Sequence, residues 1–125
     1  MAKTILVVDD SASLRRVVNL ALTAAGYDIV EAGDGVEGLK KLADMGGKKV
    51  HLIISDVNMP RMDGIEFVTE LKKQAAFKFT PVIMLTTEGD DEVKNAGRAA
   101  GAKAWIIKPF NPDQMLNAVS KLILP

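Results

Sequence analysis

The sequence predicts an α/β protein built on a doubly wound sheet of five parallel strands, and three observations support this fold class. Short, continuous apolar runs rich in β-branched residues recur along the chain, for example ILVV at 5–8 and LII at 52–54. Such runs are typical of strands buried on both faces. Segments with helical periodicity separate the runs from end to end, without a linker or repeat. We therefore expect right-handed crossovers with helices on both faces of the sheet.

The strands are expected where turn residues bound the apolar runs. The five segments are residues 4–8, 27–31, 51–55, 81–85 and 102–107. Five helices should alternate with them. In the first, Ser11 or Ser13 is the candidate N-cap and Gly26 the stop signal. The fourth, from about Asp90 to Ala100, has few large apolar residues and should be the least stable. The inner faces of the five helices are expected at Leu14, Val17, Val18, Ala21, Leu22 and Ala25; at Val36, Leu39, Leu42 and Ala43; at Ile65, Val68 and Leu71; at Val93, Ala96, Gly97 and Ala100; and at Met115, Leu116, Val119, Leu122 and Ile123.

Length and composition restrict the possible functions. At 125 residues the chain has the size of one domain, and we expect a single domain over residues 1–125. Sixteen basic and sixteen acidic residues cancel, so the charge gives no indication of binding to nucleic acid or to an anionic membrane. There is no cysteine, and no apolar stretch approaches the roughly 18 residues of a membrane span. We therefore expect a cytoplasmic monomer.

Charged side chains follow three of the expected strands. Asp9 and Asp10 come after the first, Asp56 after the third and Lys108 after the fifth. The carboxyl ends of parallel strands border the ligand crevice of such a sheet, so three carboxylates and one ammonium should converge there. Two like charges about 4 Å apart repel by roughly 4 kcal/mol at an effective dielectric of 20. This set of oxygen ligands favours a hard divalent cation such as Mg²⁺.

Five motifs in register resemble those of the receiver domain of two-component response regulators. They are the pair Asp9 and Asp10, Asp56 at a strand end, the run DVNMPRMDG over residues 56–64, Thr86 at the end of the fourth strand, and Lys108 followed by Pro109 and Phe110. The resemblance covers essentially the whole chain and is closest to stand-alone chemotaxis members of the family. It implies a flavodoxin-like (βα)5 sheet of strand order 2-1-3-4-5 and no output domain.

The resemblance implies a role for each residue of the site. Asp56 would accept a phosphoryl group from a histidine kinase as a carboxylate nucleophile. Lys108 would neutralise charge on the phosphoryl oxygens, and its bond to Pro109 would be cis. Mg²⁺ is the implied cofactor, with Mn²⁺ as a substitute, and no organic cofactor is implied. The implied metal ligands are Asp9, Asp10, Asp56 and the backbone carbonyl of Asn58.

Two further roles implied by the resemblance concern signalling. The Thr86 hydroxyl would donate to the phosphoryl group, and an aromatic residue on the fifth strand would then turn inward. Here that residue is Trp105, where tyrosine or phenylalanine is more usual. Because indole is larger, we expect its inward burial to be incomplete. Asn58 and Glu88 occupy positions that adjust the lifetime of the acyl phosphate in this family.

A receiver of this kind is a signalling phosphoacceptor, not an enzyme with a separate substrate, and it catalyses only its own phosphorylation and dephosphorylation. The expected partners are a chemotaxis-type histidine kinase, a flagellar switch protein or another downstream protein, and a phosphatase. A phosphorelay intermediate that passes phosphate to a histidine phosphotransfer protein would share every site residue. An aspartyl-phosphate phosphohydrolase would need further segments for substrate recognition. A flavin or nucleotide carrier would need a glycine-rich phosphate cradle in place of the DDSAS turn at 9–13.

Overall fold

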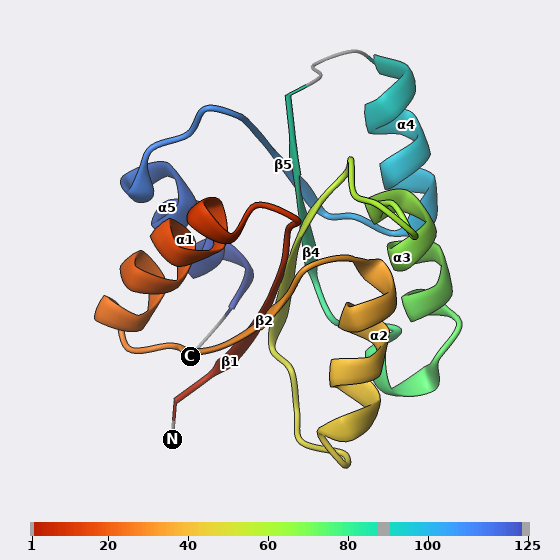
Figure 1. The fold of residues 1–125 in the computed structure, drawn as a ribbon, viewed down its shortest axis with the longest axis horizontal. Helices are drawn as coiled ribbons and strands as arrows, with labels where there is room; N and C mark the ends of the chain where they lie inside the picture. Colours follow the sequence, from red (N-terminus) through yellow and green to blue (C-terminus); the bar gives the residue numbers. More distant parts are fainter. Residues whose placement is uncertain (1, 88–90, 124–125) are drawn as a thin grey trace.

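The structure, a computed structural model, describes residues 2–87 and 91–123. In this part of the chain, five parallel strands alternate with five α-helices, and a short 3-10 helix follows the third α-helix (Figure 1). The strands are β1 (Thr4–Val8), β2 (Asp28–Ala32), β3 (Leu52–Asp56), β4 (Val82–Thr86) and β5 (Ala104–Ile107). The helices are α1 (Ala12–Ala24), α2 (Gly35–Asp44), α3 (Gly64–Lys72), the 3-10 helix η1 (Ala75–Phe77), α4 (Asp91–Ala100) and α5 (Pro112–Leu122).

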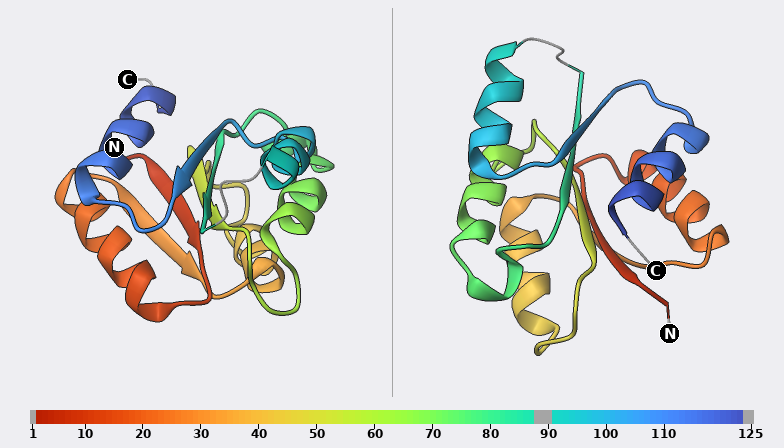
Figure 2. Two further views of the ribbon diagram at one scale, coloured as in Figure 1. Left: turned by 90° about the horizontal axis from the view of Figure 1, so that it is seen from above. Right: turned by 180° about the vertical axis from the view of Figure 1, so that it is seen from behind.

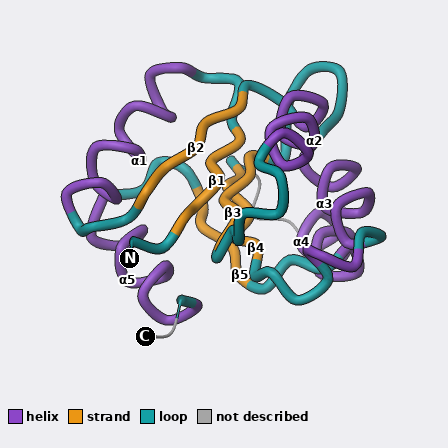
Figure 3. The backbone as a smooth tube through the Cα atoms, turned by 90° about the horizontal axis from the view of Figure 1, so that it is seen from below, coloured by secondary structure: helices purple, strands orange, loops and turns teal. Residues whose placement is uncertain are grey.

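The sheet has the order β2-β1-β3-β4-β5, with every neighbouring pair parallel. The doubly wound fold and its strand order, expected from the sequence, are therefore confirmed. Helices α1 and α5 cover one face of the sheet, and α2, α3 and α4 cover the other, as the views of the molecule from above, behind and below show (Figures 2 and 3). Among the described residues, no helix is long and apolar enough to span a bilayer.

Two apolar layers hold the helices on the sheet. Successive strand residues point to opposite faces, so in β1 Ile5 and Val7 pack towards α1 and α5, while Leu6 and Val8 pack towards α2, α3 and α4. All five residues of β1, β3 and β4 are buried. Burial on both faces explains why each of these strands contains a continuous apolar run instead of alternating apolar and polar residues.

Several expected boundaries were wrong by one or two residues. The second, third and fourth strands each begin one residue later than expected, and β5 begins at Ala104 instead of residue 102. Tyr27 and Ala102 instead close helix ends: their amide groups donate to the carbonyls of Leu22 and Gly97. These hydrogen bonds belong to Schellman caps, in which the preceding residue, Gly26 or Gly101, has a positive φ.

Three helix faces also differ from expectation. Four residues that were expected on the inner faces of the first two helices are exposed: Val17 (48%) and Ala25 on the first, Val36 (40%) and Ala43 on the second. On α4, Gly97 is buried and Val93 and Ala100 pack against the core, but Ala96 is exposed. These five residues were placed by periodicity, and periodicity alone could not decide which of the small or marginal residues of each apolar stripe face the sheet. The expected start of this helix at residue 90 lies outside the described residues.

The start of α3 lies directly against the end of β3. The Gly64 amide donates to the Val57 carbonyl at 2.8 Å, and Asp63 caps the helix by accepting from the Glu66 amide at 2.8 Å. A Cβ atom on Gly64 would lie only 2.1 Å from the backbone oxygen of Asp56. Glycine at this position therefore allows the helix to approach the backbone that carries the Asp56 carboxylate.

Gly64→Ala should lower the free energy of unfolding by about 3 kcal/mol, since the added methyl group overlaps backbone that cannot move aside easily. Gly33→Ala is the matched control, because the nearest atom to its new Cβ would be 3.7 Å away. The control should change the same free energy by less than about 0.5 kcal/mol. Urea denaturation of both variants measures the difference, and equal stabilities would contradict the close approach.

Candidate functional site

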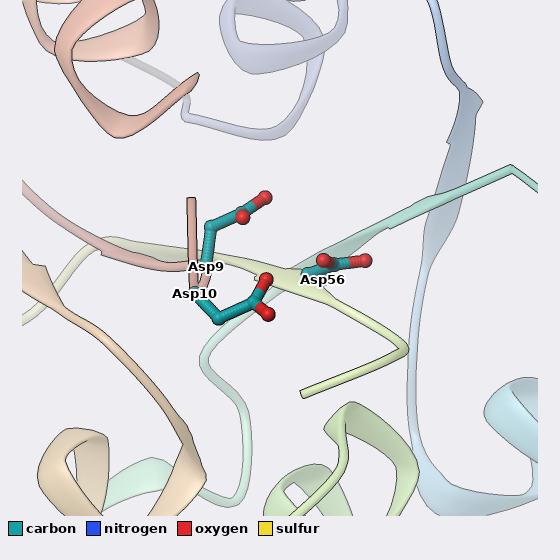
Figure 4. Close-up of side chains that lie close together, drawn as sticks. All are labelled: Asp9, Asp10 and Asp56. Atoms are coloured by element: carbon teal, nitrogen blue, oxygen red, sulfur yellow. The ribbon is translucent and has the colours of Figure 1, made fainter. Parts of the chain in front are cut away.

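Three carboxylates meet at the carboxyl ends of β1 and β3 (Figure 4). Asp9 and Asp10 follow β1, and Asp56 is the last residue of β3. Each offers one oxygen atom, and these three oxygen atoms all lie within 4.8 Å of one another. Asp9 and Asp56 are buried, with exposed fractions of 1% and 5%, whereas Asp10 is exposed. The cluster therefore has two fixed members and one that faces solvent.

Lys108 is the counter-ion of the cluster. Its Nζ atom lies 3.2 Å from Asp9 Oδ2 and 3.1 Å from Asp56 Oδ2. Its amide donates to the Thr86 carbonyl at 2.8 Å, which fixes the segment after β5 to the end of β4. The Lys108–Pro109 peptide bond is cis, as expected. Three carboxylates and one ammonium leave two uncompensated negative charges when all four groups are ionised.

The turn after β1 is fixed by hydrogen bonds to Asp9. Its Oδ1 atom accepts from the Ser11 amide at 2.8 Å, and its backbone carbonyl accepts from Arg15 Nη1. Arg15 also contacts Glu31 of β2, with 3.1 Å between Nε and Oε1. Ser11 is the N-cap of α1, since its hydroxyl accepts from the Leu14 amide. Of the two serines considered as caps, Ser11 is therefore correct.

Comparison with known proteins identifies the family. The chain matches the response regulator receiver domain over residues 5–120. The chain belongs to this family. Receiver domains bind Mg²⁺ at an acidic pocket, and the cluster of Asp9, Asp10 and Asp56 supplies such a pocket here.

The receiver domain is closely related to chemotaxis regulators. It is 40% identical over 121 residues to the chemotaxis protein CheY1 of Helicobacter pylori, an alignment that covers 96% of this chain and 95% of that protein. Chemotaxis protein CheY4 of Vibrio cholerae has the same fold, with a TM-score of 0.92 and 44% identity over 98% of this chain and 99% of that one. CheY in the CheX–CheY–BeF3–Mg²⁺ complex of Borrelia burgdorferi matches with a TM-score of 0.89 and 27% identity, covering 98% and 90% of the two chains.

The electrostatics of this receiver site follow from its burial. Desolvation and the neighbouring Asp9 charge raise the pKa of the Asp56 carboxyl, although Lys108 and the Asn58 amide oppose this. Burial alone would lower the pKa of Lys108, but its contacts with Asp56 and Asp9 outweigh burial and raise it. Lys108 therefore stays charged, while Asp56 carries its charge at an energetic cost that a divalent cation would offset.

The other expected site residues border the cluster. The Asn58 amide donates to Asp56 Oδ1 at 3.4 Å, and its side chain is exposed. Thr86 is the fully buried last residue of β4 and pairs with Ile107. Glu88, expected to influence the lifetime of the acyl phosphate, lies outside the described residues. The structure thus places Asn58 two residues after Asp56, and Thr86 at the end of β4, where its carbonyl accepts from the Lys108 amide.

Trp105 packs against α4 in this receiver. It is partly buried and adjoins the apolar layer beneath α2, α3 and α4. It pairs with Met84 in the sheet, so it lies on the same face as Met84 and Thr86. A Cβ atom on Gly97 would lie 2.3 Å from Cη2 of the indole. Glycine at position 97 therefore makes room for the large ring.

The sequence interpretation missed three charged residues beside the site: Arg15, Asp34 and Arg61. Asp34 precedes a helix and is followed three residues later by Glu37, a spacing that is a recognisable N-cap signal. Its pairing with Arg61, 27 residues away, depends on tertiary structure and has no local signal.

Asp56→Asn should stabilise the metal-free protein at neutral pH. Because the pKa of Asp56 is raised, the folded state binds the proton of the Asp56 carboxyl more tightly than the unfolded state does. Protonation of Asp56 therefore stabilises the fold fully at low pH, and this stabilisation is lost as pH rises through the folded-state pKa. In EDTA at neutral pH the variant should melt at a higher temperature, by roughly 4 °C for each kcal/mol of relieved repulsion. The difference should shrink towards about pH 4. A variant that melts at or below the wild-type temperature at neutral pH would contradict this.

Gly97→Ala should displace the Trp105 indole from α4. Helix propensity alone would stabilise α4 by about 1 kcal/mol, so the sign of the change is diagnostic. We expect a lower melting temperature and stronger acrylamide quenching of Trp105, the only tryptophan of the chain. A more stable variant with unchanged quenching would show that the indole does not depend on this glycine.

Proposed function

We propose that this receiver accepts a phosphoryl group on Asp56 from a histidine kinase while Mg²⁺ or Mn²⁺ is bound. It then changes its affinity for a downstream protein in chemotaxis or flagellar motor control. The observation that carries the proposal is the position of Lys108 Nζ, 3.1 Å from Asp56 Oδ2, beside two further carboxylates. The near full-length likeness to CheY1 and CheY4 supports action as a single cytoplasmic domain.

The chemistry follows from the charges. A carboxylate oxygen of Asp56 attacks phosphorus, a P–O bond forms as the P–N bond of the donor phosphohistidine breaks, and the imidazole leaves with the electron pair. Lys108 pairs with a phosphoryl oxygen, and Asp9 keeps this ammonium near the acceptor. The groups that would hold the cation are the carboxylates of Asp9, Asp10 and Asp56 and the carbonyl of Asn58. When bound, the cation neutralises charge on the phosphoryl oxygens.

The switch would run from the acceptor to α4. Phosphorylation adds roughly 1.5 to 2 negative charges and new acceptor oxygens beside Thr86. Thr86 and Trp105 lie on the face of the sheet that α4 covers, so a movement of Thr86 towards the phosphoryl group opens space for the indole. The downstream protein would then read the changed surface around α4 and β5.

The receiver offers an apolar surface to its protein partners, next to Lys108. Leu14 and the exposed Val17 of α1, with Pro109 and Phe110 after the cis bond, line most of a cavity of about 420 Å³ next to Lys108. A kinase segment that contacts this cavity would bring its phosphohistidine close to Asp56. The CheX–CheY complex of a relative supports a second protein as a further partner, and we propose that this partner is a phosphatase.

Intact mass spectrometry after incubation with acetyl phosphate tests the acceptor. Wild type should gain one phosphoryl group with Mg²⁺ and none in EDTA, and Asp56→Asn should gain none. Asp63→Asn is the matched control, because Asp63 is a nearby carboxylate that only caps α3. It should label like wild type. Equal labelling of wild type and Asp56→Asn would remove Asp56 from this role.

Lys108→Ala should separate phosphoryl binding from the switch. Wild type saturated with beryllofluoride and Mg²⁺ should show a changed Trp105 emission, whereas Lys108→Ala should lose most of this change. The exposed Lys103, which precedes β5, provides the control variant Lys103→Ala, and this should respond like wild type. A full response in Lys108→Ala, or no response in wild type, would contradict the coupling from the site to β5.

A further inference from the structure

A salt bridge joins two loops beside the carboxylate cluster, and neither partner is an expected acceptor or metal ligand. Arg61 lies in the loop between β3 and α3, and Asp34 lies in the loop between β2 and α2. Arg61 Nη2 is 2.7 Å and Nε is 2.8 Å from Asp34 Oδ2. The loop of Arg61 also contains Asn58, whose carbonyl would complete the metal site.

Asp34 is a fixed anchor for this contact. Its side chain is only 10% exposed, and its Oδ1 atom accepts from the Glu37 amide at 2.9 Å as the N-cap of α2. Burial would raise the pKa of Asp34, but the hydrogen bonds from Glu37 and Arg61 lower it, so the carboxylate is charged at neutral pH. With one oxygen held by α2 and the other by Arg61, the carboxylate has little freedom to rotate.

The loop that Arg61 holds is conformationally constrained. Arg61 has a φ of 63°, in the left-handed region that residues other than glycine rarely adopt. The next residue, Met62, packs so closely on α2 that a Cβ on Gly35 would lie 2.8 Å from its Cγ. The Gly35 amide also donates to the Met62 carbonyl at 3.4 Å. The salt bridge and this backbone contact therefore fasten the β3–α3 loop to the start of α2.

We propose that Arg61 and Asp34 are a positioning pair, which holds the β3–α3 loop so that the Asn58 carbonyl faces the carboxylate cluster and thereby sets the affinity for Mg²⁺. This inference rests on the proposed metal site. Arg61 is 61% exposed, and exposed ion pairs contribute little to global stability. Arg61 acts instead on the geometry of the β3–α3 loop, because its partner Asp34 is buried and the loop is already held against the start of α2.

Isothermal titration with Mg²⁺ tests the pair through two matched variants. Arg61→Asn removes the guanidinium but keeps a residue that tolerates the left-handed conformation. Asp34→Asn removes the charge but keeps an oxygen that can cap α2. Each variant should bind Mg²⁺ about tenfold more weakly than wild type. The double variant should be no weaker than the single ones, because both break the same contact.

The two variants change the net charge in opposite directions. By charge alone, Arg61→Asn would strengthen the binding of a cation and Asp34→Asn would weaken it, so a similar loss in both indicates a geometric cause. Arg61→Lys, which offers a single point charge, should recover part of the affinity. Variants that bind Mg²⁺ like wild type would overturn the inference, even if they melt at a lower temperature in EDTA. A wild type that binds no Mg²⁺ would instead overturn the metal site itself, and the inference with it.

Discussion

Repulsion among Asp9, Asp10 and Asp56 is the interaction on which the rest of the site depends. Parallel strands bring their carboxyl ends to one edge of the sheet, and two of the three carboxylates are buried there. Two like charges about 4 Å apart repel by roughly 4 kcal/mol at an effective dielectric of 20, and solvent screens the exposed Asp10 more strongly than the buried pair. Lys108 offsets part of this cost. The remaining negative charge is the physical reason why the site would favour a divalent cation and a phosphoryl group that accompanies it.

The contacts of Lys108 also link the carboxylate cluster to the face of the sheet that α4 covers. The Lys108 amide donates to the Thr86 carbonyl, so Lys108 is fixed to the strand that carries Thr86. Trp105 lies three residues before Lys108, against Gly97 of α4. Only a few residues in contact therefore separate the carboxylate cluster from α4. Because Gly97 already accommodates the indole, tryptophan can occupy this position without forcing α4 away from the sheet.

Features that depend on local periodicity could be predicted from the sequence, and features that depend on tertiary contacts could not. The apolar runs predicted the buried strands, and the rule that ligands bind at strand ends predicted the convergence of Asp9, Asp10, Asp56 and Lys108. Tyr27 and Ala102 were assigned to strands although they close helices, because their hydrogen bonds require the positive φ of the preceding glycine. The pair Asp34 and Arg61 brings together distant loops, and neither residue type indicates its partner.

Thermal melting of the wild-type protein over a series of Mg²⁺ concentrations tests the central claim most directly. If the carboxylate cluster is a cation site, the melting temperature should rise with the logarithm of the Mg²⁺ concentration above the dissociation constant. Mn²⁺ should act similarly, and NaCl at the same ionic strength should have a much smaller effect. A melting temperature that responds to Mg²⁺ no more than to NaCl would contradict the account.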